Sequence, residues 1–371
     1  MTLDEILATR RVVICVGSGG VGKTTTAAAL AVEAARRGRT TAVLTVDPAQ
    51  RLKDALGLRT LDGTPRRVPL GRGAGRLDAL LLDVKRTFDE LVRGLATTPE
   101  QADRVLNNRL YQNLSGTLTG TAEYMAVETV YRLATEHDYD LLVVDTPPAQ
   151  HAADFLDAPR RLLALLDSRV FAILKDPTII LPGASSKLAQ MILTGVMSGL
   201  ERFTGLGLMS EIGEFIRAIE TLSVNFRTRV AGVSSLLHAD ETALLLVTAP
   251  EPRLTSETTA LLEALRAMGH TIEGVIVNRA LPQATFGRQT PGPPPLPEAE
   301  PELLRRLIAS WDDLTTWAGR QASTIHPLLA AAEAPLLAEV PFLPAAPASI
   351  EELIALAQHL VAPRPKSAAS A

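Results

Sequence analysis

The sequence has few of the residues that disulfide-linked, zinc-clustered or nucleic-acid-binding proteins need. Its 371 residues include one cysteine, Cys15, so an internal disulfide or a cysteine zinc cluster cannot form. Aromatic residues make up 4% of the chain, which leaves few side chains on which single-stranded nucleic acid could stack. The formal net charge of −4 disfavours binding of DNA or RNA through a basic face. We therefore expect no nucleic-acid partner and no zinc.

Long apolar runs are also missing, and we expect no export signal. The longest uncharged apolar stretch in the middle of the chain, residues 188–200, is too short to span a bilayer. The first residues, MTLDEILATRR, contain acidic side chains and do not resemble a secretory signal. Cys15 lies within an apolar run and is expected to be a small buried hydrophobe. We expect a cytoplasmic protein.

What the sequence does contain is an alternation of strand and helix signals. Apolar runs predict strands at 11–16, 41–46, 141–145, 243–248 and 272–278, with weaker candidates at 77–83 and 336–340. Most of these runs are continuous rather than alternating, as in strands that are buried on both faces. Helices are predicted at 22–37, 255–268 and 349–361, the last with a capping box of Ser349 and Glu352. The fold class is therefore α/β, with a mostly parallel sheet covered by helices on both faces.

A phosphate-binding loop is predicted between the first strand and the helix that follows it. The pattern G-x-x-x-x-G-K-[ST] is matched by Gly17-Ser18-Gly19-Gly20-Val21-Gly22-Lys23-Thr24. Glycines let successive backbone N–H groups surround phosphate oxygens, and the helix adds the positive end of its dipole. We expect Lys23 to reach the β- and γ-phosphates, Thr24 to ligate Mg²⁺ and Thr25 to help with the α-phosphate. The loop thus predicts a P-loop NTPase that binds ATP and Mg²⁺.

Two aspartates stand at the ends of predicted strands. Asp145 ends the strand 141–145 and Asp47 follows the strand 41–46. Because the carboxyl ends of parallel strands meet at one edge of a sheet, both should face the same crevice. Asp145 is expected in the Mg²⁺ shell, with a cap after a strand as the alternative. Asp47 is placed to orient or deprotonate an attacking water, and an N-cap role ahead of Pro48 is an equal alternative.

Three stretches interrupt the alternation. Residues 158–238 predict several helices without a strand, residues 281–300 are proline-rich and predict an extended loop, and residues 362–371 predict a disordered tail. No internal repeat is present. We predict a single P-loop ATPase domain over residues 1–361, with a helical insertion at about 158–238.

Together these motifs resemble the ArsA family of ATPases, which includes the arsenical-pump ATPase and the ATPase that targets tail-anchored membrane proteins. The similarity runs over nearly the whole chain. The motifs that carry it are GSGGVGKTTT, VDPAQRLKD, DTPPAQH, TAPE at 248–251, VNR at 277–279 and VPFLP at 340–344. The resemblance implies that Asp47 is the hydrolytic aspartate and Asp145 the Mg²⁺-linked carboxylate. It also implies that Asn278, Pro341 and Phe342 hold the adenine, and that Glu251 reaches nucleotide across a dimer interface.

The chain departs from the family pattern in two respects. The family loop carries a lysine that touches the phosphates of the partner subunit, and Ser18 occupies that position here. A hydroxyl cannot supply the missing positive charge, so Arg51 or a paralogous partner would have to compensate, and both a homodimer and a heterodimer stay open. With Cys15 alone, neither the arsenite site nor the Cys-x-x-Cys zinc clasp of other members can form.

The helical stretch 158–238 leaves the wider function open. Its methionines and glycines among aliphatic residues suit an adaptable surface for a hydrophobic or membrane-protein client, but packing within the subdomain or on a partner subunit is the alternative. We predict a dimeric ATP-hydrolysing nucleotide switch. The alternatives are a positioning or scaffold protein like MinD or ParA and a slow regulatory subunit of a heterodimeric ATPase. The terminal helix is acidic and then neutral, which disfavours the MinD type.

Overall fold

The computed structural model describes residues 1–49, 51–71, 73–108, 121–167, 223–281, 301–343 and 345–361. These form two compact units. Unit 1 comprises the described residues within Met1–Leu81, Leu133–Ala153 and Asp240–Ala371, and unit 2 those within Leu82–Arg132 and Asp154–Ala239. Every residue proposed above for the phosphate site belongs to unit 1. In the described ranges, no helix combines the length and the apolar character that crossing a membrane requires.

Unit 1 is built on a sheet whose described strands follow the order β3-β4-β2-β5-β1-β6-β7-β8. Neighbours are parallel, except that β3 runs antiparallel to β4 at one edge. The strands are β1 (Val12–Val16), β2 (Thr41–Thr45), β3 (Arg66–Arg67), β4 (Leu77–Leu81), β5 (Leu141–Asp145), β6 (Thr242–Thr248), β7 (Gly274–Ala280) and β8 (Leu336–Pro341). This confirms the predicted α/β class and mostly parallel sheet. Strand β3 was not among the predicted strands, because two exposed arginines carry no strand signal.

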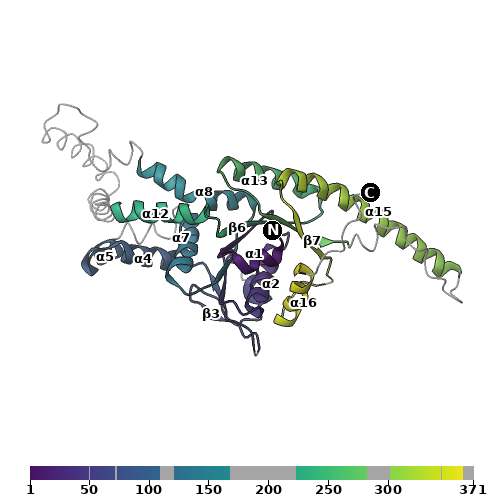
Figure 1. Cartoon of the computed structure of the whole chain (residues 1–371), viewed down its shortest axis with the longest axis horizontal. Coiled ribbons are helices and arrows are strands. Elements are labelled where there is room, and N and C mark those ends of the chain that lie inside the picture. The colour runs from purple at the N-terminus through teal and green to yellow at the C-terminus, as the bar shows by residue number, and fades with distance from the viewer. Residues whose placement is uncertain are drawn as a thin grey trace, which may run out of the picture. The chain divides into compact units, whose positions relative to one another are not determined.

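Helices cover both faces of this sheet. On one face α1 (Leu3–Thr9), α2 (Lys23–Arg36) and α16 (Ile350–Val361) pack together, and alternate strand residues such as Val13, Cys15 and Val143 join them in one apolar cluster. On the other face α13 (Thr255–Ala267) lies beside α15 (Pro301–Ala332), which also contacts β7 (Figure 1). The short α3 (Arg51–Ala55) contacts α2, and the 3₁₀ turn η2 (Pro252–Leu254) precedes α13. Cys15 is fully buried, as predicted.

The two predicted capping residues of α16 act separately. Ser349 Oγ accepts a 3.2 Å hydrogen bond from the N–H of Glu352, as predicted, but the Glu352 carboxylate accepts from Ala348 N–H instead of from Ser349. A complete capping box forms at α1, between Thr2 and Glu5. Both arrangements satisfy N–H groups that a helix start leaves unpaired.

Unit 2 is helical in its described residues. It contains α4 (Val84–Leu95), α5 (Pro99–Leu106), α12 (Ser223–Leu237) and most of α7 (Thr121–Glu136) and α8 (Ala149–Leu166). Its interior is partly polar, because the buried Glu128 of α7 pairs with Arg229 of α12 at 2.7 Å, and Arg229 lies over the ring of Tyr131. Much of the insertion predicted at 158–238 lies outside the described residues. The proline-rich stretch after Leu281 and the tail 362–371 lie outside them too.

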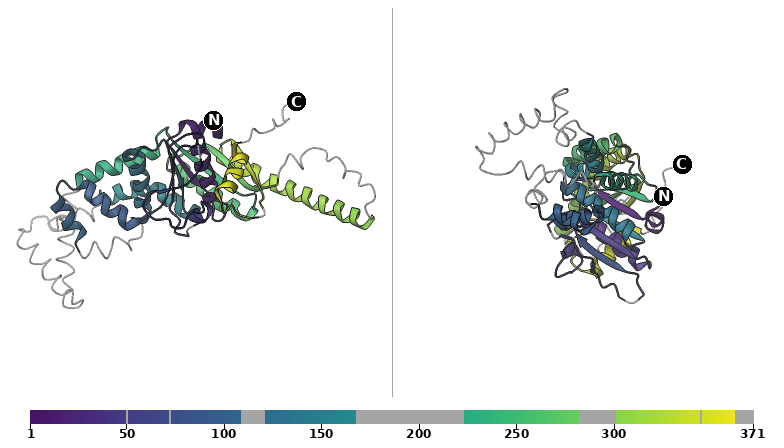
Figure 2. Two further views of the ribbon diagram at one scale, coloured as in Figure 1. Left: turned by 90° about the horizontal axis from the view of Figure 1, so that it is seen from below. Right: turned by 90° about the vertical axis from the view of Figure 1, so that its left-hand side faces the viewer.

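Helix α15 leaves part of its apolar face uncovered. In its C-terminal half one face is buried through residues that recur every three or four positions, namely Ala318, Gln321, Ile325 and Leu328. The same face continues into the N-terminal half, which projects beyond the sheet in the left view of Figure 2. Between positions 303 and 317, large apolar side chains are between 37% and 52% exposed, namely Leu303, Leu307, Ile308, Leu314 and Trp317.

Candidate nucleotide site

The loop between β1 and α2 has a backbone shape that requires glycine. Gly17 has a φ of 151° and Gly22 a φ of 93°. A Cβ atom on Gly17 would lie 2.0 Å from the carbonyl oxygen of Val247, and one on Gly22 would lie 2.1 Å from Asn278 Nδ2. Side chains are therefore excluded from both positions, and the backbone N–H groups of the loop stay accessible to an anion. The loop runs directly into the N-terminus of α2, which favours negative charge.

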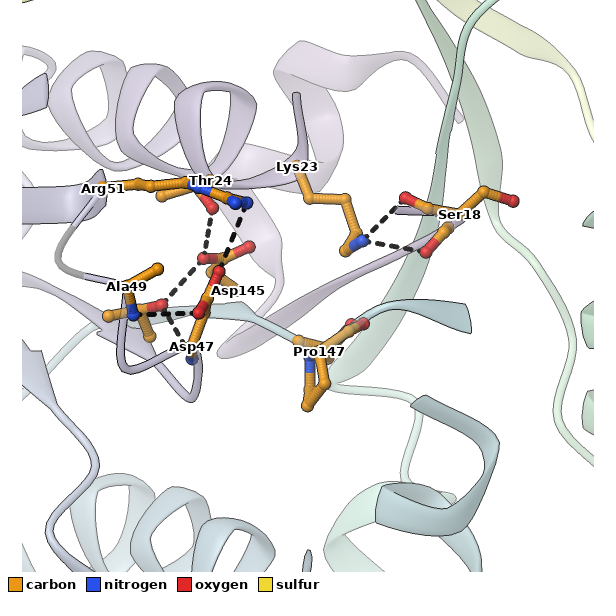
Figure 3. Close-up of polar contacts among 11 residues, drawn as sticks. Ser18, Lys23, Thr24, Asp47, Ala49, Arg51, Asp145 and Pro147 are labelled. Carbon is orange, nitrogen blue, oxygen red and sulfur yellow. Dashed lines mark hydrogen bonds and ion pairs between the residues drawn. The ribbon is translucent and has the colours of Figure 1, made fainter. Parts of the chain in front are cut away.

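Lys23 folds back over this loop. Its Nζ donates hydrogen bonds to the carbonyl oxygens of Gly17 at 2.8 Å and Ser18 at 2.9 Å (Figure 3). Burial lowers the pKa of the Lys23 ammonium, and the nearby Asp145 charge opposes that shift. Both hydrogen-bond partners are neutral carbonyls, so a phosphate anion would be a stronger partner for this ammonium.

Asp145 is the buried acid of the site. Its Oδ2 accepts hydrogen bonds from Thr24 Oγ1 at 2.7 Å and Thr45 Oγ1 at 2.8 Å (Figure 3). Its buried Oδ1 has no hydrogen-bond partner among the residues that the structure describes. Burial raises the pKa of the Asp145 carboxyl to about 6. A carboxylate oxygen without a partner beside a threonine hydroxyl is the type of oxygen-rich site that Mg²⁺ prefers, so these residues fit the cation.

Asp47 lies in the turn after β2 and is linked to Asp145 through Thr45. Thr45 Oγ1 accepts from the Asp47 N–H at 3.2 Å and donates to Asp145. Asp47 Oδ1 accepts from Ala49 N–H at 2.9 Å, and Oδ2 lies 3.4 Å from Arg51 Nη1 (Figure 3). The Asp47 carboxylate thus accepts a hydrogen bond within its own turn. This contact is similar to the N-cap role that was the alternative for Asp47. Its side chain is 26% exposed, so water can reach it.

The Ser18 side chain points away from the loop. Its hydroxyl is fully buried and lies 3.1 Å from Thr258 Oγ1 of α13, while its carbonyl oxygen accepts from Lys23 (Figure 3). Ser18 therefore contributes its backbone to the loop and its side chain to the packing of α13. The sequence contained no signal for the Thr258 contact, because the two residues are 240 positions apart.

The residues predicted to hold adenine lie at the ends of β7 and β8. Asn278 Nδ2 donates a 2.8 Å hydrogen bond to the carbonyl oxygen of Val21, which ties β7 to the phosphate loop. Pro341 ends β8, and Phe342 follows it with its N–H bonded to Ala280 and its side chain 58% exposed. Thr25 lies in the first turn of α2 and is half-buried.

Glu251, predicted from the resemblance, lies just before η2 and holds two arginines. Its carboxylate is 2.6 Å from Arg253 and 3.7 Å from Arg279. Neither arginine was assigned a role from the sequence, and nor was Thr45. The signal available for Thr45 was a polar residue at the end of an apolar strand, directly before Val46 and Asp47.

A family model of anion-transporting ATPases, the ArsA family, matches residues 10–288. This range contains the phosphate loop, Asp47, Asp145, Glu251 and Asn278. The chain belongs to the ArsA ATPase family. As predicted, this ArsA ATPase is a P-loop enzyme that binds and hydrolyses ATP.

The ArsA ATPase is similar to several fungal proteins. It is 27% identical to ATPase GET3 of Phaeosphaeria nodorum over 286 residues, which cover 76% of this chain and 80% of that protein. It is 27% identical to ATPase get3 of Aspergillus terreus over 272 residues, or 71% and 72% of the two chains. A shorter match, 30% over 165 residues, is to ATPase GET3 of Malassezia globosa and covers 43% and 46%.

Proposed function

We propose that this ArsA ATPase is a Mg²⁺-dependent, dimeric nucleotide switch that captures a hydrophobic or membrane-protein client. The observation that carries the nucleotide part is the buried Asp145 carboxylate, with one oxygen on the Thr24 hydroxyl and the other without a partner in the described chain. Thr24 and Asp145 would hold Mg²⁺. The bound cation supplies positive charge that offsets the negative charge of the reacting phosphates.

The remaining roles in the reaction fall to groups around the loop. The N–H groups of the loop, from Gly17 to Thr24, bind phosphate oxygens, and Lys23 exchanges its two carbonyl partners for the β- and γ-phosphates. Asp47 orients the attacking water and accepts its proton, for which its partial exposure leaves room. Thr25 binds the α-phosphate. Asn278, Pro341 and Phe342 hold the adenine, and Glu251 contacts nucleotide across the dimer interface.

The partner subunit is either a second copy or a paralogue. The Ser18 hydroxyl is engaged with Thr258 and carries no charge, so it cannot act on the phosphates of a partner. In a homodimer Arg51 is a candidate for this task, because its side chain is 65% exposed and its contact with Asp47 is long. A slow regulatory subunit of a heterodimer is the second candidate function, and Ser18 is the observation that favours it. No described feature favours a MinD- or ParA-like scaffold.

Two observations support a hydrophobic client. The N-terminal half of α15 exposes a row of large apolar side chains, which an apolar helix could cover. Curated relatives carry the name ATPase GET3. The family that the sequence motifs resemble includes an ATPase that targets tail-anchored membrane proteins. The predicted client surface within 158–238 stays a proposal, as does the cytoplasmic compartment. So do the predicted absences of zinc, arsenite and nucleic acid.

Single-turnover ATP hydrolysis tests the nucleotide part. We expect Asp47→Asn to bind Mg·ATP and to lose turnover by ~10²-fold or more, the size expected when a general base is removed. Asp54→Asn, an exposed aspartate on α3, is the matched control and should hydrolyse normally. The mass in solution with and without Mg·ATP then reports dimer formation. Turnover that survives Asp47→Asn would refute the assigned role, and tight binding without turnover by the unmodified chain would favour the regulatory subunit.

A further inference from the structure

Strand β7 contains an irregularity beside the phosphate loop. In the ladder between β7 and β8 the register shifts between Val277 and Ala280, and Arg279, within that interval, has a φ of 57°. A residue with positive φ in a strand bulge is usually glycine, because a side chain disfavours this backbone conformation. Bulges occur often next to active sites, where they redirect side chains.

The second non-glycine residue with positive φ in the described chain has an ordinary explanation. Glu333 has a φ of 51° and follows the last residue of α15, where a left-handed residue commonly ends a helix. Arg279 lies within a strand and has no such explanation. Backbone strain that persists at a site is a reason to look for a function of the strained residue.

Two adjacent residues at the bulge contact groups around the site, Asn278 the phosphate loop and Arg279 the carboxylate of Glu251. Asn278 donates to Val21 of the phosphate loop, and its Oδ1 accepts a 2.9 Å hydrogen bond from the Arg279 N–H, which orients the amide. The Arg279 guanidinium is 46% exposed and lies 3.7 Å from Glu251. An exposed ion pair at this distance is weak, so a multiply charged anion can compete for the guanidinium.

The phosphate loop supplies little positive charge for binding a nucleoside triphosphate. Ser18 supplies none, and Lys23 is the single cation within the loop sequence. We propose that Arg279 is a nucleotide-binding residue whose guanidinium leaves Glu251 and binds the phosphates of ATP. This proposal rests on the proposed nucleotide site, and it assigns to Arg279 part of the charge that the loop lacks at Ser18.

Arg279→Gly separates a binding role from a structural one, because glycine accepts the positive φ and removes only the side chain. The matched control is Glu333→Gly, which relieves the same kind of strain away from the loop. Binding of ATP with Mg²⁺ is measured by calorimetry for both variants, Arg279→Lys and the unmodified chain, at about 50 mM and about 300 mM salt. Thermal unfolding without nucleotide is measured in parallel.

We expect both glycine variants to unfold at or above the temperature of the unmodified chain. Arg279→Gly alone should weaken ATP binding, by roughly ten-fold at low salt, the size of a charge-assisted contact, and by less at high salt. Arg279→Lys should recover part of the affinity. An affinity of Arg279→Gly within about two-fold of the unmodified chain, or a loss equal to that of Glu333→Gly, overturns the proposal. If the unmodified chain binds ATP without hydrolysing it, the proposed function fails. The ratio of the ATP affinities of Arg279→Gly and the unmodified chain would then still test the role of Arg279. If it does not bind ATP, both fail.

Discussion

Thr24 and Asp145 are 121 residues apart, and the hydroxyl of Thr24 donates a 2.7 Å hydrogen bond to Asp145 Oδ2. The contact joins the first turn of α2 to the end of β5, which lies beside β1 in the sheet. It brings the last residue of the phosphate loop and the buried acid together.

Replacing Thr24 tests whether its hydroxyl serves the cation. We expect Thr24→Ala to reduce Mg²⁺-dependent turnover by ~10²-fold, because one proposed ligand is lost and Asp145 loses a hydrogen-bond donor. Thr24→Ser retains the hydroxyl and is the control. Turnover is measured across a Mg²⁺ titration, and a Thr24→Ala variant with normal Mg²⁺ dependence would remove Thr24 from the site.

The raised pKa of the buried Asp145 carboxyl predicts that the stability of the protein depends on pH. Burial raises its pKa to about 6 in the folded protein, above its ordinary value, so the folded chain binds more protons than the unfolded chain between about pH 4 and pH 6. The contribution of Asp145 to the free energy of unfolding therefore falls as pH rises through this window, by up to about 3 kcal/mol, and stays low above it. Asp145→Asn should remove the fall and be the more stable protein at pH 7.5.

Urea unfolding in metal-free buffer at several pH values measures this difference between Asp145→Asn and the unmodified chain. The comparison cancels the other titrating groups, because they are common to both proteins. A stability difference that does not grow between pH 4 and pH 7 would contradict the assignment.

Alanine substitutions at two glycines with nearly the same φ separate the effect of backbone strain from that of a steric clash. Gly22 has a φ of 93° and Gly38 a φ of 92°, so alanine should cost about 1 kcal/mol of stability at either position. A Cβ atom at Gly22 would also collide with Asn278 Nδ2, whereas nothing lies within 4 Å of one at Gly38. We expect Gly22→Ala alone to weaken ATP binding, by ten-fold or more, as measured by calorimetry. Equal affinities of the two variants would show that the Asn278 contact has no part in the loop.

Ser18 provides a test of its interior contact. Ser18→Ala should cost about 1 kcal/mol of unfolding free energy, because Thr258 loses a partner. Ser18→Lys, which restores the residue that the resemblance leads one to expect, should destabilise the chain more, because a long charged side chain must leave the buried position of the serine. Unfolding and single-turnover hydrolysis are measured together. A Ser18→Lys protein that is as stable as the unmodified chain and hydrolyses ATP faster would show that the Thr258 contact does not restrict this position.

The sequence by itself determined the strands of the sheet except β3, and the phosphate loop, since these are encoded by neighbouring residues. Apolar runs such as 141–145 form buried strands wherever helices cover them, and the glycine pattern of residues 17–22 specifies a loop that side chains cannot enter. The carboxyl ends of parallel strands share an edge of the sheet, so the sequence was enough to place Asp47 and Asp145 together.

Tertiary structure decided which side chains meet. The hydroxyl of Ser18 lies on Thr258, and Asn278 contacts Val21, in each case across more than two hundred residues. Thr45 joins Asp47 to Asp145, and Arg279 adopts a backbone angle that no local propensity favours. These contacts depend on how distant segments pack and on which polar groups must be satisfied once they are buried, and a local sequence pattern carries no information about either.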